Sequence, residues 1–232
     1  MFKSSVITWS FVWIFSLHCL GGCAYLKKVS DEKEETPADL MSEGMEALEK
    51  GYSEAAIEAF QKIKDRYPYS KFVMEAELRM GDALYKRGYH DEAFDAYNQF
   101  ERLHPKNENI PYVIYQKGMC HFDQVTTLDR DQSHTLLAKR EFERLIKNFP
   151  ETEYTFEADR NIRECYIKLA EHELYVGGFY FKKKKFHAAS GRYRYLLESY
   201  PDLGQYHKAI ERLKKCTENL ALAQNDDDGG GS

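Results

Sequence analysis

One spacing occurs four times along this chain and restricts the fold more strongly than any other feature. An alanine is followed four residues later by an aromatic residue and twelve residues later by a proline, and a glycine precedes each copy. The copies are Gly44, Ala56, Phe60 and Pro68; Gly81, Ala93, Tyr97 and Pro105; Gly118, Ala138, Phe142 and Pro150; and Gly177, Ala189, Tyr193 and Pro201. Glycine, alanine, aromatic and proline in this order are typical of tetratricopeptide repeats.

Helix geometry accounts for the spacing. The small alanine lets two helices approach closely, and the aromatic residue four positions later shares its face. The proline ends the second helix of each pair, because it lacks an amide donor and disfavours helix in the preceding residue. We therefore expect an all-α superhelical array of four helix pairs over residues 38–224. A C-terminal capping helix over 205–222 should close it, followed by a disordered tail over 225–232.

Two departures from the period predict where the array is irregular. In the third copy the alanine follows the glycine by 20 positions, where in the others it follows by 12, and the additional residues fall around 125–135. This predicts an enlarged loop. Between Pro150 and Gly177 there are 14 more residues than in the other intervals, close to four helical turns. A single long helix over about 152–182 would absorb them, although the Gly177-Gly178 pair weakens it by about 1 kcal/mol per glycine.

The N-terminus predicts export and acylation. A mostly apolar run over 6–20 suits a signal peptide and is too short for a transmembrane helix. It ends in Leu20-Gly21-Gly22-Cys23, which fits a bacterial lipobox and predicts a signal peptide over 1–22. Cys23 would then carry a diacylglycerol and an N-acyl chain as a lipid anchor, followed by a flexible tether within 23–37. The alternative is an ordinary cleavage site with an incidental cysteine. The residue directly after Cys23 is Ala24. In enterobacteria an aspartate at this position favours retention in the inner membrane, so Ala24 favours the outer membrane.

The remaining composition favours binding over catalysis. The net charge of −5 gives no basic surplus for nucleic acid. The eight histidines lack zinc-ligand spacing, and no nucleophile or phosphate-loop motif stands in a supporting context, so we expect no enzyme activity, no metal and no cofactor. Three cysteines lie on expected helices as buried small residues, and whether two of them form a disulfide stays open; these are Cys120, Cys165 and Cys216.

With lipobox and repeats together, the chain resembles the BamD family, the tetratricopeptide lipoproteins of the bacterial β-barrel assembly machinery. The most specific segments are Pro111-Tyr112-Val113-Ile114-Tyr115-Gln116-Lys117-Gly118, then Asp129-Arg130-Asp131, then Phe149-Pro150-Glu151-Thr152-Glu153-Tyr154. The resemblance implies a lipid-anchored protein on the periplasmic face of the outer membrane. It also implies binding to BamA through a POTRA domain, to unfolded outer-membrane β-barrel proteins and to other assembly lipoproteins. The third-repeat loop is shorter than in enterobacterial members, so no partner of that loop is implied.

Candidate contact residues follow from helix faces and from the resemblance. The first helix of each repeat lines the inner surface of a superhelix, and residues three or four apart share a face. This predicts a client-binding groove formed by Leu78, Asp82, Tyr85, Tyr112, Tyr115 and Met119. Packing between helices is an equal alternative for Tyr115 and Met119. The candidate for the contact with BamA is Arg192, because the resemblance matches it to a family position implicated in BamA binding. The run Lys182, Lys183, Lys184 and Lys185 is either a second contact, to an acidic POTRA surface or lipid headgroups, or a solvated turn.

Two other classes of tetratricopeptide protein remain open at this stage. A pilotin that brings secretin subunits to the outer membrane would lack the extended fourth-repeat helix. A periplasmic coordinator of cell-wall enzymes would often be soluble, and Cys23 would then be unacylated.

Overall fold

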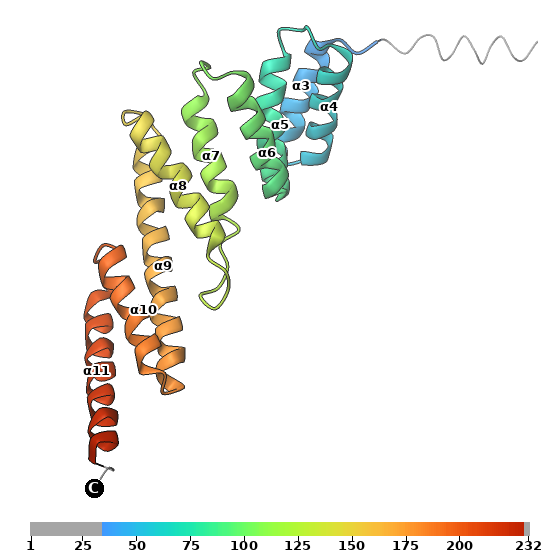
Figure 1. Cartoon of the computed structure of the whole chain (residues 1–232). Coiled ribbons are helices and arrows are strands. Elements are labelled where there is room, and N and C mark those ends of the chain that lie inside the picture. The colour runs from blue at the N-terminus through green and yellow to red at the C-terminus, as the bar shows by residue number, and fades with distance from the viewer. Residues whose placement is uncertain (1–33, 230–232) are drawn as a thin grey trace, which may run out of the picture.

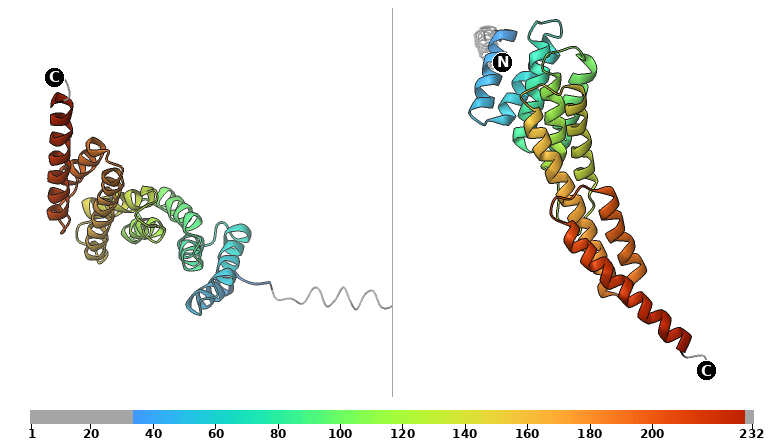
Figure 2. Two further views of the ribbon diagram at one scale, coloured as in Figure 1. Left: turned by 90° about the horizontal axis from the view of Figure 1, so that it is seen from below. Right: turned by 90° about the vertical axis from the view of Figure 1, so that its left-hand side faces the viewer.

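The computed structural model describes residues 34–229, with side chains up to Ala223, and every regular element in this range is an α-helix. The helices are α3 (Pro37–Glu49), α4 (Ser53–Arg66), α5 (Val73–Arg87), α6 (His90–Leu103), α7 (Ile110–Phe122), α8 (Ser133–Asn148), α9 (Thr155–Lys182), α10 (Phe186–Ser199) and α11 (Tyr206–Gly229). Each helix packs on the next one in sequence. They form an elongated, curved array with α3 and α11 at opposite ends (Figures 1 and 2). The expected all-α class is confirmed.

The four glycines explain why the repeat spacing is kept. Each lies against the aromatic ring of its own repeat, so that a β-carbon at the glycine would come within 2.4–2.6 Å of a ring carbon. The pairs are Gly44 with Phe60, Gly81 with Tyr97, Gly118 with Phe142, and Gly177 with Tyr193. The pairs α3–α4, α5–α6, α7–α8 and α9–α10 are therefore the four predicted repeats.

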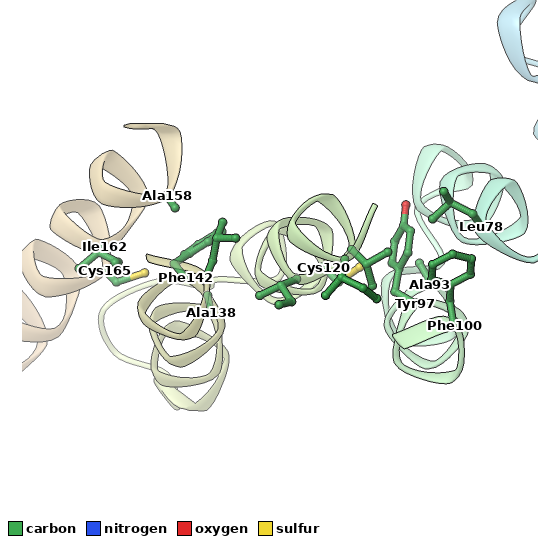
Figure 3. Packing of buried hydrophobic residues seen from close by; sticks show 14 residues of the cluster. Leu78, Ala93, Tyr97, Phe100, Cys120, Ala138, Phe142, Ala158, Ile162 and Cys165 are labelled. Atoms are coloured by element: carbon green, nitrogen blue, oxygen red, sulfur yellow. The ribbon is translucent and has the colours of Figure 1, made fainter. Parts of the chain in front are cut away.

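The core is distributed along the array, as expected where each repeat contacts only its neighbours. Three clusters of buried side chains follow one another, and the largest extends from α5 to α9 (Figure 3). Cys120 and Cys165 belong to this cluster and Cys216 to the C-terminal one; all three are fully buried free thiols, which confirms the expected burial. Burial raises the pKa of the Cys120 and Cys165 thiols to about 12, so they stay protonated.

Both predicted irregularities are confirmed. Helix α9 is 28 residues long and passes through Gly177 and Gly178 without a break. The enlarged loop lies between α7 and α8, and side-chain hydrogen bonds hold it in place. The Gln132 side chain donates hydrogen bonds to two backbone oxygens within the loop, while His172 Nδ1 of α9 donates to the Leu128 carbonyl oxygen at 2.6 Å.

The expected C-terminal boundary is wrong. The sequence predicts a disordered tail from Asn225, but α11 continues to Gly229. Adding residues to a formed helix costs little, and the segment Ala221-Leu222-Ala223-Gln224 consists of strong helix formers that carry the helix onward. Residues 1–33, which include the expected signal peptide, Cys23 and most of the tether, lie outside the described residues. Within the described range no helix is long and apolar enough to cross a membrane.

Candidate binding surfaces

Two of the three client-groove candidates on α5 are buried. Leu78 is 1% exposed and packs inside the largest core cluster, so the expectation that it lines an open groove is wrong. Asp82 is also buried. Its carboxylate accepts hydrogen bonds from the hydroxyls of Tyr97 and Tyr112 and from Arg79 Nη1, each at 2.7 Å. Asp82 is therefore committed to internal partners and fixes the position of Tyr112 instead of offering a surface itself.

The α7 candidates gather around a residue that sequence reasoning did not single out. Tyr154, at the start of α9, has ring centroids of Tyr112 and Tyr115 at 5.6 and 5.5 Å, and the Tyr115 ring is stacked at 27°. Met119 Sδ on α7 lies 3.4 Å from Nδ2 of Asn161 on α9. All four are half-buried against the core. The packing alternative for Tyr115 and Met119 thus describes part of each side chain, and the rest remains exposed.

The tyrosine hydroxyls in this region remain donors. Burial, with Asp82 close by, raises the pKa of Tyr97 and Tyr112 above the usual tyrosine range. Tyr85 has a raised pKa through burial and through its hydrogen bond to Asp123. A cavity of about 240 Å³ opens beside the Tyr112–Tyr154 pair, and its lining residues are Glu108, Asn109, Pro111, Tyr112, Thr152, Glu153 and Tyr154. We call Tyr112, Tyr115, Met119 and Tyr154 the central aromatic surface.

Arg192 lies on α10 and ties this helix to α9. Its Nη1 is 3.3 Å from Oε2 of Glu173, whose side chain is 7% exposed, while the Arg192 side chain is 44% exposed. Glu171, His172 and Glu173, adjacent in sequence, therefore have three different surroundings. Glu171 is exposed, His172 holds the α7–α8 loop, and Glu173 pairs with Arg192.

Lys182 is the last residue of α9, and Lys183, Lys184 and Lys185 form the turn to α10. All four lysines are exposed. Lys184 has a φ of 58°, in the left-handed region, where the first two repeats have Gly51 and Gly88 at φ 80° and 85°. Its amide donates to the Phe181 carbonyl at 2.9 Å. No ion pair of these lysines occurs within the part of the chain that the structure describes.

The helical array and its surfaces can be compared with known proteins. A family model described as "YfiO: Outer membrane lipoprotein" matches residues 33–229. A protein of Rickettsia prowazekii, "Outer membrane protein assembly factor BamD", is 34% identical over 203 residues, covering 88% of this chain and 79% of the relative. The chain belongs to the BamD family of outer membrane lipoproteins. BamD proteins of Caulobacter vibrioides and Vibrio cholerae are 29% and 27% identical, covering 88% and 90% of this chain and 67% and 90% of their own lengths.

Membership of the BamD family fits the repeat order, the long α9 and the expected lipoprotein character. The BamD family is a family of assembly factors and not of enzymes. Among solved structures, a tetratricopeptide repeat protein from Parabacteroides merdae aligns with 82% of this chain and 77% of its own, at 14% identity and a TM-score of 0.42. In the part of the BamD-family chain that the structure describes, no three His, Cys, Asp or Glu residues are grouped to hold a metal ion.

Proposed function

We propose that this chain is a scaffold of the β-barrel assembly complex, anchored through Cys23 on the periplasmic face of the outer membrane. It binds BamA through a POTRA domain, receives unfolded outer-membrane β-barrel proteins, and has other assembly lipoproteins as further partners. The observation that supports this proposal is the family match over 33–229, which includes both the central aromatic surface and the α9–α10 pair with Arg192.

Arg192 is suited to hold an acidic residue of BamA. Its Nη1 faces the Glu173 carboxylate, and the side chain remains 44% exposed. A guanidinium carries five N–H donors, so one internal ion pair leaves donors for a second carboxylate. Glu173 orients Arg192 before the partner arrives, which reduces the entropy lost on binding. The exposed Lys182–Lys185 turn adds positive charge nearby and would mainly accelerate association with an acidic surface.

The central aromatic surface is the client site in this proposal. Tyr112, Tyr115 and Tyr154 offer ring faces with hydroxyl groups, and Met119 offers an adaptable thioether. Such side chains suit extended, unfolded segments that alternate apolar and polar residues. Leu78 has no part in this site. The buried Asp82 positions Tyr112 by accepting the 2.7 Å hydrogen bond from its hydroxyl.

Co-purification of BamA with the tagged full chain tests the BamA contact. Arg192→Glu is a poor probe because it would place a second carboxylate beside the buried Glu173, which would destabilise the α9–α10 pair. Arg192→Gln avoids this repulsion. Arg194→Gln is a matched control, because Arg194 is exposed on the same helix but two residues, and so about 160°, around it.

We expect Arg192→Gln to reduce recovered BamA at least tenfold, since loss of one partner of a hydrogen-bonded charge pair costs about 2–5 kcal/mol. Arg194→Gln should recover BamA like the wild type, with equal helicity by circular dichroism. Equal recovery by both variants would place the interface elsewhere. Recovery of secretin or cell-wall enzymes without BamA would contradict the proposed function.

Photo-crosslinking tests the client site. A crosslinking amino acid at Tyr115 or Tyr154 should capture unfolded β-barrel proteins, whereas the same amino acid at Tyr69, which is fully exposed on the α4–α5 connection, should not. Capture at Tyr69 that equals capture at Tyr154 would contradict a localised client site.

A further inference from the structure

A second surface lies between α9 and α11 and shares only Lys182 with the contacts proposed above. It is a groove with a volume of about 650 Å³. We call it the α9–α11 groove and define it by Tyr175, Gly178, Phe179 and Lys182 of α9 and Lys208 and Arg212 of α11. Leu128, from the loop that His172 holds in place, closes one side of it.

Gly178 has a role in this groove that the repeat pattern does not explain. Its neighbour Gly177 accommodates the Tyr193 ring, as the equivalent glycines do in the other repeats. Gly178 faces Arg212 instead. A β-carbon at Gly178 would lie 2.8 Å from Arg212 Nη1, so the guanidinium rests directly on the backbone of α9. The absence of a side chain at 178 therefore allows Arg212 to lie within the groove.

Among the described residues, the side chains of Arg212 and its neighbouring cations have no hydrogen-bond or ion-pair partner. The Arg212 side chain is half-buried, yet it makes no such contact, and the same holds for the exposed side chains of Lys182 and Lys208. Among the described residues that line the groove, Glu171 is the only acidic one. Three cations and one carboxylate give the groove a net charge of +2, in a chain whose net charge is −5. Its charge is thus complementary to an acidic ligand.

The groove also presents aromatic surface. Tyr175 and Phe179 are 50% and 53% exposed, one helical turn apart on α9. Half-exposed aromatic rings beside an unpaired guanidinium are the features of residues that dominate binding at protein interfaces. The combination selects a ligand that carries both carboxylates and apolar side chains.

We propose that the α9–α11 groove binds an acidic peptide segment of a partner protein. A carboxylate of the segment pairs with Arg212 in the two-pronged geometry that guanidinium favours, and apolar side chains of the segment cover Tyr175 and Phe179. Lys182 and Lys208 attract neighbouring carboxylates.

This site is distinct from the Arg192 contact and goes beyond the proposed function. Glu173, which pairs with Arg192, is two residues from both Glu171 and Tyr175. At about 100° per residue it lies nearly opposite them on α9. A variant can therefore impair one surface and leave the other intact.

Fluorescence anisotropy with the purified full chain tests the proposal. The probe is a fluorescein-labelled synthetic peptide with two glutamates for each phenylalanine, and the control peptide has lysine in place of glutamate. We expect saturable binding of the acidic peptide that weakens with added salt, and no binding of the lysine peptide. Arg212→Gln should raise the Kd about tenfold or more, and Arg212→Lys should restore part of the affinity.

Two further variants separate binding from folding. Gly178→Ala displaces the Arg212 guanidinium without removing it, so the Kd should rise severalfold while helicity is retained. Arg194→Gln should leave the Kd unchanged, because Arg194 is exposed on α10 and does not line the groove. An equal Kd for wild type and Arg212→Gln, or equal binding of the lysine peptide, would overturn the proposal.

Two other occupants are outcomes of the same experiment, and each would also overturn the proposal. Arg212-dependent binding of soluble dihexanoyl phosphatidylglycerol, with no binding of the acidic peptide, would identify a lipid headgroup. Self-association in sedimentation velocity that Arg212→Gln abolishes would identify a second copy of the chain.

Discussion

Gly177 lies in direct contact with Tyr193 across the α9–α10 pair, so that a β-carbon at Gly177 would come within 2.4 Å of Tyr193 Cε1. The Tyr193 ring is fully buried and has no room to move. The next residue, Gly178, faces the flexible end of Arg212 instead. The two adjacent glycines therefore avoid contacts with different neighbours. Alanine should change the free energy of unfolding in opposite directions at the two positions.

Gly177→Ala should lower the free energy of unfolding by about 2 kcal/mol, because overpacking a tight core costs about 1–3 kcal/mol and exceeds the gain in helix propensity. Gly178→Ala should raise it by about 0.5–1 kcal/mol, since Arg212 can move aside and alanine favours the helix. Urea denaturation followed by circular dichroism measures both. A change of the same sign and size in the two variants would disprove the different contacts.

The hydroxyls of Tyr97 and Tyr193 provide a second matched pair. Both rings occupy the aromatic position of their repeats and are buried, but Tyr97 donates to Asp82 at 2.7 Å. The Tyr193 hydroxyl is buried and has no hydrogen-bond partner among the described residues. Tyr97→Phe should lower the free energy of unfolding by about 2 kcal/mol, and Tyr193→Phe should raise it by about 1 kcal/mol. Thermal unfolding measures both, and equal losses would mean that the two hydroxyls have equivalent partners.

The helix pairs were predictable from the sequence because the signal is local and steric. Gly44 and Phe60 lie on neighbouring helices that a short connection joins, so their spacing records a contact within one repeat. The length of α9 was predictable for the same reason, since an insertion in whole turns preserves the buried face.

The candidate surfaces were less predictable because they depend on what covers each helix face. Leu78 and Tyr85 share one face of α5 by spacing, yet Leu78 is enclosed by the core and Tyr85 remains half-exposed. The contacts between Arg192 and Glu173 and between Arg212 and Gly178 join residues of different helices that no motif links. Only the packing of α9 with α10 and α11 reveals them.

The backbone of Lys184 should limit the stability of the α9–α10 turn. Its φ of 58° is unfavourable for a residue with a side chain, and Gly51 and Gly88 occupy this conformation in the first two repeats. Lys184→Gly should therefore raise the free energy of unfolding by about 0.5–1 kcal/mol. Lys183 has a φ of −83°, so Lys183→Gly should lower it by a similar amount. Equal losses in the two variants would show that the left-handed backbone carries no strain.

A buried ion network in the middle of the array should make stability depend on pH. Lys117 is 4% exposed, and its Nζ lies 3.0 Å from the Glu101 carboxylate, which Arg144 also contacts. Burial alone would raise the pKa of Glu101, but the hydrogen bonds from Arg144 and Lys117 outweigh it and hold this pKa below its usual value. A lowered folded pKa stabilises the fold above the unfolded pKa of about 4.3, and this contribution is lost as pH falls through the folded value.

Glu101→Gln should therefore be less stable than the wild type at pH 6, by about 2 kcal/mol, because Lys117 loses its closest carboxylate. At pH 3 the wild-type carboxyl is increasingly protonated, so the difference between the two proteins should shrink. Urea denaturation at both pH values measures this difference, with Glu164→Gln as the control, since Glu164 is exposed on α9. A difference that stays constant from pH 6 to pH 3 would mean that Glu101 stabilises the fold through packing and not through its charge.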